Sequence, residues 1–125
     1  MYTTDIETEA RANNAFRRVL MTTARVQIVV MALQPGEDIG AEVHRHTDQV
    51  LTFVEGFASA EVNGDTRSVG PGDIVLVPAG MRHNFINIGN TVLKLYTIYS
   101  PPNHAPGTVH VTKADALRMQ DHKVS

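Results

Sequence analysis

The sequence consists largely of short runs of β-branched and aliphatic residues, and turn-forming residues separate these runs from one another. About nine of the runs are predicted to be strands: 16–23, 25–33, 41–46, 50–55, 57–62, 66–69, 74–77, 83–88 and 92–99. Asn63-Gly64 lies between two alternating runs and indicates a type I′ hairpin. Many short strands with almost no helix between them predict an all-β sandwich or barrel.

The two ends of the chain lack this pattern. Asp5 is predicted to open a short helix in a polar N-terminal segment, where apolar residues are too few for a core helix. We expect this segment to be a short arm that caps the barrel or packs on a neighbour. Near the C-terminus a short strand is expected at 108–111, followed by a short helix over 113–120. Thr112 is its predicted cap, and Asp115 completes a capping box.

Length and composition exclude several classes of protein. The 125 residues suffice for one ordinary domain, expected to comprise a barrel at about 16–100 and a tail at 101–125. The absence of cysteine excludes disulfides and thiolate metal ligands. A net charge of -2 without a basic stripe argues against a nucleic-acid partner. No apolar run approaches the ~20 residues of a membrane helix, and the acidic N-terminus is unlike a signal peptide, so a cytoplasmic protein is expected.

Histidines are the residues that point most directly to chemistry. Of six in the chain, His44, His46 and His83 fall in predicted strand contexts. His44 and His46 are two residues apart, so in a strand their imidazoles leave the same face. Gln49 is out of phase with this pair, and it reaches the same side only if Thr47-Asp48 forms a bulge or tight turn.

Together these side chains predict a metal site. His44 and His46 from one strand and His83 from a distant strand supply three imidazoles, and Gln49 adds an amide oxygen. Positions for water or substrate then remain. Such ligands suit one divalent transition metal ion, which the sequence does not identify among manganese, iron, nickel, copper and zinc. The alternative is that the histidines are ordinary exposed or hydrogen-bonded residues, which is the commoner situation for a lone histidine in a strand.

A more specific pattern surrounds these residues. The segment GDIVLVPAGMRHNFIN matches the second cupin motif, G-x5-P-x-G-x2-H-x3-N, at Gly72, Pro78, Gly80, His83 and Asn87. The segment HRHTDQVLTFVEG resembles the first motif, in which H-x-H, a short gap and a glutamate precede six residues and a glycine. From Pro35 to Asp115 the chain resembles small bacterial single-domain cupins, some labelled mannose-6-phosphate isomerase-like. The resemblance implies a jelly-roll or double-stranded β-helix barrel with a metal in it.

Three features depart from the first motif. The glycine usually found six residues before the first histidine is replaced by Asp38, with Gly36 and Gly40 on either side. The gap after the second histidine is one residue shorter than usual. Gln49 stands where the motif has its glutamate, so the site loses a negative charge and is expected to bind a dication more weakly. The position of His46 is often not histidine in similar sequences.

Other polar residues are given weaker roles. Glu55 is a weak candidate for a general acid or base if it points inward, although a charge at a strand end is the commoner situation. Tyr99 is interpreted as a core or interface residue, and Arg82 as exposed. His104 and His110, in the tail, are interpreted as surface histidines, with a position at the barrel mouth or against a second subunit as the alternative.

The fold by itself does not determine a function. A metal-dependent enzyme acting on a small organic molecule, by oxygenase, isomerase or lyase chemistry, is the first hypothesis. A non-catalytic module that binds or senses a small molecule or sugar is the second, and a metal-free structural barrel is the third. A homodimer is expected, because a barrel with open edge strands has edges to protect.

Overall fold

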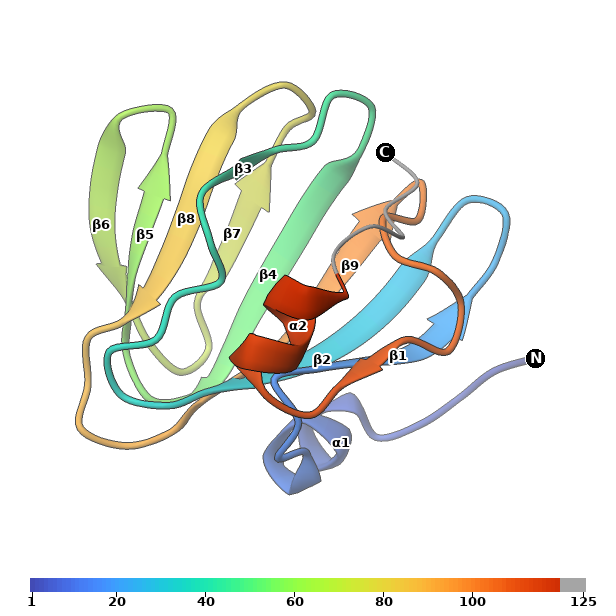
Figure 1. Ribbon diagram of the computed structural model, residues 1–125, viewed down its shortest axis with the longest axis horizontal. Helices are drawn as coiled ribbons and strands as arrows, with labels where there is room; N and C mark the ends of the chain where they lie inside the picture. The colour runs from blue at the N-terminus through green and yellow to red at the C-terminus, as the bar shows by residue number, and fades with distance from the viewer. Residues whose placement is uncertain (120–125) are drawn as a thin grey trace.

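The computed structural model describes residues 1–119 of the chain, which form two antiparallel sheets that face each other (Figure 1). In spatial order the larger sheet contains β10 (Val109–His110), β1 (Arg17–Thr22), β2 (Gln27–Leu33), β9 (Leu93–Ser100), β4 (Asp48–Glu55) and β7 (Ile74–Val77). The smaller sheet contains β3 (Glu42–Val43), β8 (Arg82–Asn87), β5 (Ala58–Val62) and β6 (Asp65–Val69). The prediction of an all-β barrel is confirmed.

The apolar core fills the space between the two sheets. Strand β4 buries every second residue over most of its length, so Leu51 and Phe53 point inward, and β8 places Phe85 opposite them. The rings of Phe53 and Phe85 pack with centroids 6.0 Å apart. Truncation of either ring to alanine is expected to cost about 3–5 kcal/mol, because both are fully enclosed. This core joins the two sheets and holds their strands in register.

The hairpin predicted from Asn63-Gly64 connects β5 and β6. Both turn residues have positive φ, 50° for Asn63 and 87° for Gly64, as a type I′ turn requires. Val62 and Asp65 pair directly across the turn. The local sequence therefore sets the register of this strand pair.

The N-terminal helix α1 (Ile6–Ala12) packs on the chain's own larger sheet. Asp5 caps it by accepting a hydrogen bond from the Thr8 amide. Ala10 is fully buried against Val30 and Val54 on the outer face of the sheet. The segment is therefore a cap on its own barrel, one of the two arrangements expected.

The C-terminal helix α2 (Lys113–Arg118) begins as predicted, with Thr112 as its cap and a reciprocal capping box with Asp115. It ends at Arg118, and position 120 of the predicted helix lies outside the described residues. Lys113 attaches the helix to the smaller sheet's side of the molecule through an ion pair with Asp38. Within residues 1–119, no helix has the length and apolar character needed to cross a membrane.

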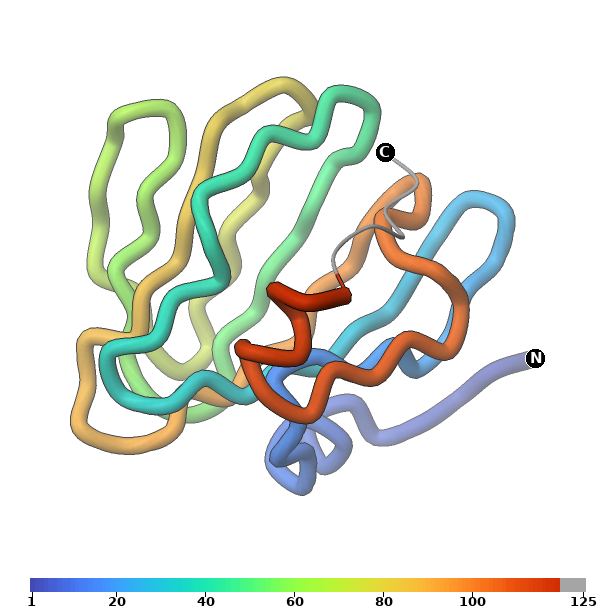
Figure 2. Tube along the Cα trace, viewed as in Figure 1, coloured from blue at the N-terminus to red at the C-terminus, as the bar shows by residue number. Residues whose placement is uncertain are grey.

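The strand predicted over 41–46 is wrong in its length. Strand β3 ends at Val43, and β4 already begins at Asp48. Between them the chain passes from the smaller sheet to the larger one, as Figure 2 shows at the teal-to-green turn. The change of sheet resets the alternation of side chains, so positions before and after it no longer share a parity.

Candidate metal centre

Two loops that carry motif residues are joined at this crossing. The Gly80 amide donates to the His44 carbonyl at 2.7 Å, and the Ala79 amide donates to Oδ1 of Asp48 at 2.8 Å. Pro78, Gly80 and the residues around them thus hold the end of β3 and the start of β4 against the start of β8. This backbone arrangement places His44 next to His83.

His44 and His83 form a buried pair of imidazoles. Their ring centroids are 5.0 Å apart, and only 5% and 4% of their surfaces are exposed. Nδ1 of His83 lies 2.9 Å from the Met81 carbonyl oxygen. Because a carbonyl only accepts, Nδ1 carries the proton, and in this neutral tautomer the lone pair of the His83 imidazole is on Nε2.

Gln49 is buried on β4, opposite Tyr99 in the register of β4 and β9. Its Nε2 donates to Oγ1 of Thr97 at 3.1 Å and to Oη of Tyr99 at 3.2 Å. The Thr97 hydroxyl in turn donates to the Val50 carbonyl at 2.9 Å, which keeps its lone pairs toward the amide. Oε1 of Gln49 is buried and makes no hydrogen bond with any described residue. A buried acceptor of this kind is costly unless something satisfies it.

Tyr99 connects Gln49 to the histidines. Its ring lies edge-on to His44 at 5.9 Å and edge-on to His104 at 5.3 Å. Burial raises the pKa of Tyr99 to about 12, although the charge of Arg17 acts in the opposite direction, and the charge of Glu42 raises it further. The phenol is therefore neutral near pH 7 and retains its proton.

The donor set fits a cation in its chemistry. His83 is oriented by Met81, and Gln49 is oriented by Thr97 and Tyr99, so these two donors each have a partner that fixes their direction. Within the part of the chain described, no three His, Cys, Asp or Glu side chains are close enough to hold a metal by themselves. The candidate centre therefore consists of two imidazoles and an amide oxygen, which is an N/O set suited to transition metals.

A family model for the cupin domain matches residues 29–99, which include both motif segments and more than half of the chain. The chain belongs to the cupin family. This cupin is 43% identical over 126 residues to YrkC of Bacillus subtilis, covering 96% of this chain and 68% of YrkC. It is 41% identical over 117 residues to L612 of Acanthamoeba polyphaga mimivirus, covering 90% and 73% of the two chains. The crystal structure of BH2720 from Bacillus halodurans matches with a TM-score of 0.92 at 43% identity, over 94% and 93% of the chains.

His46 does not share a face with His44, and that prediction is wrong. It is exposed on the bend between β3 and β4, whereas His44 is buried. The expectation required a strand through residue 46, and the strand ends at Val43 because the chain changes sheets there. A turn does bring His44 and Gln49 to the interior, but it begins earlier than Thr47-Asp48.

Glu42 is the residue that the sequence interpretation missed. It lies on β3 directly opposite His83, so both side chains leave the same face of the smaller sheet. Counting from Gly36, the first-motif spacing places Glu42 where the first histidine belongs and His44 where the second belongs. In this register the glycine is present and the gap before Gln49 is four residues. Two of the three departures from the motif therefore disappear, and this spacing was visible in the sequence.

The structure also shows whether the other polar candidates are exposed or buried. Glu55 is half-exposed and pairs with Arg11 of α1 at 3.4 Å, so it lies on the outside of the barrel and away from the interior. Arg82 is exposed, as expected. His104 and His110 are each only 5% exposed, so their interpretation as surface histidines is wrong. The tail turns back, so that β10 pairs with β1 at His110 and the Gln27 side chain bonds the backbone of His104.

Proposed function

We propose that this cupin holds one divalent transition metal ion between His44, Gln49 and His83. The observation that carries the proposal is the buried, unsatisfied Oε1 of Gln49, on a side chain that Tyr99 links to two buried imidazoles. His46 is left out of this set because it is exposed. The metal, when bound, supplies Lewis-acid chemistry to a small organic molecule.

The chain's own groups would position and protect that molecule. Met81 holds the tautomer of His83, and Thr97 with Tyr99 holds the amide of Gln49 so that its oxygen faces inward. Tyr99 keeps a proton at Oη near neutral pH. Burial of His44, His83 and Gln49 excludes water from the donors, which strengthens electrostatic interactions there.

We propose a metal-dependent enzyme of oxygenase, isomerase or lyase type. Its support is the neutral phenol of Tyr99 beside the buried imidazoles of His44 and His83. The resemblance to mannose-6-phosphate isomerase-like cupins is the only support for the isomerase variant. A non-catalytic binding cupin is the second candidate, because Glu55, the residue considered as a general acid or base, pairs with Arg11 on the outside of the barrel. A screen of the metal-loaded protein against metabolites and dioxygen separates the two, since a tight ligand without turnover favours the binder.

The metal itself is tested by elemental analysis of protein purified without added metal, followed by titration with manganese, iron, nickel, copper and zinc. We expect one stoichiometric first-row metal in the wild type and loss of uptake in His83→Ala. His46→Ala is the matched control and should bind metal as the wild type does. Absence of metal from the purified protein and no binding on titration would refute the proposal.

The expected homodimer is also a proposal. Its support is β7, an edge strand of the larger sheet on which Ile74 and Leu76 are 67% and 60% exposed. Light scattering should give twice the chain mass, and Leu76→Lys should shift the protein toward the monomer. A monomeric wild type at working concentration contradicts the proposal.

A further inference from the structure

Strand β1 of the larger sheet carries a buried arginine that forms no ion pair with a carboxylate of the described residues. Arg17 lies on β1 between β10 and β2, where it is opposite His110 and Met31 in register. It is 5% exposed, whereas the neighbouring Arg18 is on the outer face. Among residues 1–119, Arg17 makes no ion pair with a carboxylate.

The contacts that Arg17 does make are with uncharged groups. Nη1 lies 3.2 Å from Nδ1 of His110, and the guanidinium carbon lies 5.2 Å from the centre of the Phe16 ring. Nε of Arg17 is buried without a hydrogen-bond partner. His110 serves as an acceptor in its neutral form, because burial and the charge of Arg17 lower its pKa. A guanidinium is thus withdrawn from water with no carboxylate of the described residues within ion-pair distance, an arrangement that is costly unless an anion completes it.

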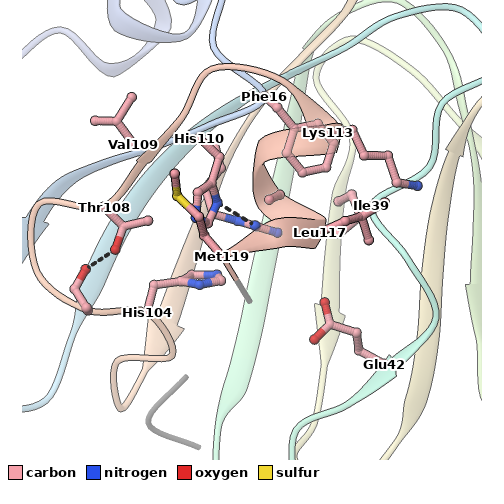
Figure 3. A pocket seen from close by; sticks show the side chains of 13 residues that line it. Phe16, Ile39, Glu42, His104, Thr108, Val109, His110, Lys113, Leu117 and Met119 are labelled. Atoms are coloured by element: carbon pink, nitrogen blue, oxygen red, sulfur yellow. Dashed lines mark hydrogen bonds between the residues drawn. The ribbon is translucent and has the colours of Figure 1, made fainter. Parts of the chain in front are cut away.

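A cavity of about 200 Å³ adjoins this arginine. His104, His110, Lys113 and Glu42 line it together with apolar side chains such as Ile39 and Leu117 (Figure 3). Arg17 and Phe16 are part of its wall. Lys113 is already paired with Asp38, so Arg17 is the cation that remains for a ligand among the described lining residues.

We propose that this cavity binds a small organic carboxylate, with the Arg17 guanidinium as its anchor and its apolar body against the apolar wall. A guanidinium presents two parallel donors that match a carboxylate, and Nε is one of the groups available for this fork. A doubly charged phosphate fits less well, because Glu42 places a negative charge on the same cavity. The volume is below that of pockets for drug-sized molecules, so the ligand is small.

The cavity is next to the candidate metal centre. His104 lines the cavity and stacks edge-on with Tyr99, which contacts His44 and Gln49. If the proposed metal function holds, the carboxylate is the substrate class of that centre. The anchor itself stands on Arg17 and the cavity alone, so it is tested on metal-free protein.

The test is calorimetry on chelator-treated protein with acetate, isobutyrate and phenylacetate, each beside its neutral amide, and with inorganic phosphate. We expect a carboxylate to bind, its amide to bind at least about tenfold more weakly, and Arg17→Gln to lose about ten- to a hundredfold in affinity, the usual value of a charged hydrogen bond. Arg18→Gln makes the same change of charge on the outer face and should bind as the wild type does.

Stability separates a ligand anchor from a structural residue. Without ligand, Arg17→Met should melt at or above the wild-type temperature, because the substitution removes a buried charge that has no counter-charge. A clear fall in melting temperature would assign Arg17 a structural role. No carboxylate binding below about 10 mM, equal binding of the amides, tighter binding of phosphate, or unchanged binding by Arg17→Gln would also overturn the proposal. Metal uptake by Arg17→Gln should be normal, so failure of the metal site and failure of the anchor give different results.

Discussion

Substitution of Gln49 by glutamate would restore the acid of the first cupin motif. The hydrogen bonds around Gln49 predict that this substitution lowers the stability of the metal-free protein. The amide nitrogen donates to Thr97 and Tyr99, and Thr97 gives its own proton to the Val50 carbonyl. In Gln49→Glu a carboxylate oxygen would face the lone pairs of Thr97. Only the Tyr99 hydroxyl is able to turn and donate. The introduced carboxylate is therefore buried with one donor, in place of an amide nitrogen that has two acceptors.

The size of this cost follows from the pKa that the new carboxyl would adopt. Position 49 is 1% exposed, and a carboxyl at such a site has its pKa raised above 7. Relative to an unfolded value near ~4.3, keeping it protonated at pH 7 costs roughly 3–4 kcal/mol. Because the folded pKa is the higher one, the loss is absent below the unfolded pKa and grows by about 1.4 kcal/mol per pH unit above it.

The assay is urea unfolding of metal-free Gln49→Glu between pH 4 and pH 8, with the wild type beside it. Gln34→Glu, which places the same charge on an exposed turn, is the control. Its unfolding free energy relative to the wild type should not fall with rising pH in this way. Saturating zinc or manganese should reduce the difference in unfolding free energy between Gln49→Glu and the wild type at pH 7, because the dication compensates the buried charge. If Gln49→Glu and Gln34→Glu have the same pH dependence without metal, the assigned direction of the Gln49 amide is wrong.

Three other substitutions test single contacts. Tyr99→Phe removes one of the two acceptors of the Gln49 amide and should weaken metal binding about tenfold in the same titration, as loss of a partner behind a ligand does. Asp38→Asn should lower the melting temperature at pH 7 by an amount equivalent to about 1 kcal/mol. The Lys113 ammonium holds the pKa of Asp38 below its usual value, so this difference should vanish as the pH falls through that lowered pKa. Glu55→Gln should leave metal uptake unchanged, because Glu55 pairs with Arg11 outside the barrel; reduced uptake would contradict its placement.

Local signals predicted the parts of the fold that depend on few residues. Asn63-Gly64 specifies its turn because both residues tolerate positive φ, and Thr112 with Asp115 specifies a helix start through two reciprocal hydrogen bonds. The strand over 41–46 was predicted too long because β-propensity continues through the point where the chain changes sheets. The hydrogen bond from Gly80 to the His44 carbonyl defines that point, and Gly80 lies 36 positions further along the chain.

The burial of the tail histidines likewise depends on residues far away in the sequence. The segment after Pro102 is short and polar, which is typical of a surface tail. Gln27 reverses that expectation, because its amide bonds the Asn103 and His104 backbone and draws the tail into the barrel end. Nothing near His104 in the sequence signals this contact. Its burial depends on a glutamine on β2.

The first motif, unlike the tail, could have been placed correctly from the sequence, because its correct register is present there. Both registers have Gln49 in place of glutamate. The register built on the H-x-H pair also requires a missing glycine, a shortened gap and an extra turn, whereas the register set by Gly36 and Gly56 requires in addition only that Glu42 replace a histidine. The second register puts His44 and Gln49 inside and His46 outside, as the structure does. It also changes the electrostatic expectation. Gln49 removes a negative charge from the motif, but Glu42 introduces one on the interior side of β3, where it contributes to the raised pKa of Tyr99. The two replacements offset each other in charge, so weak metal binding no longer follows from Gln49 alone.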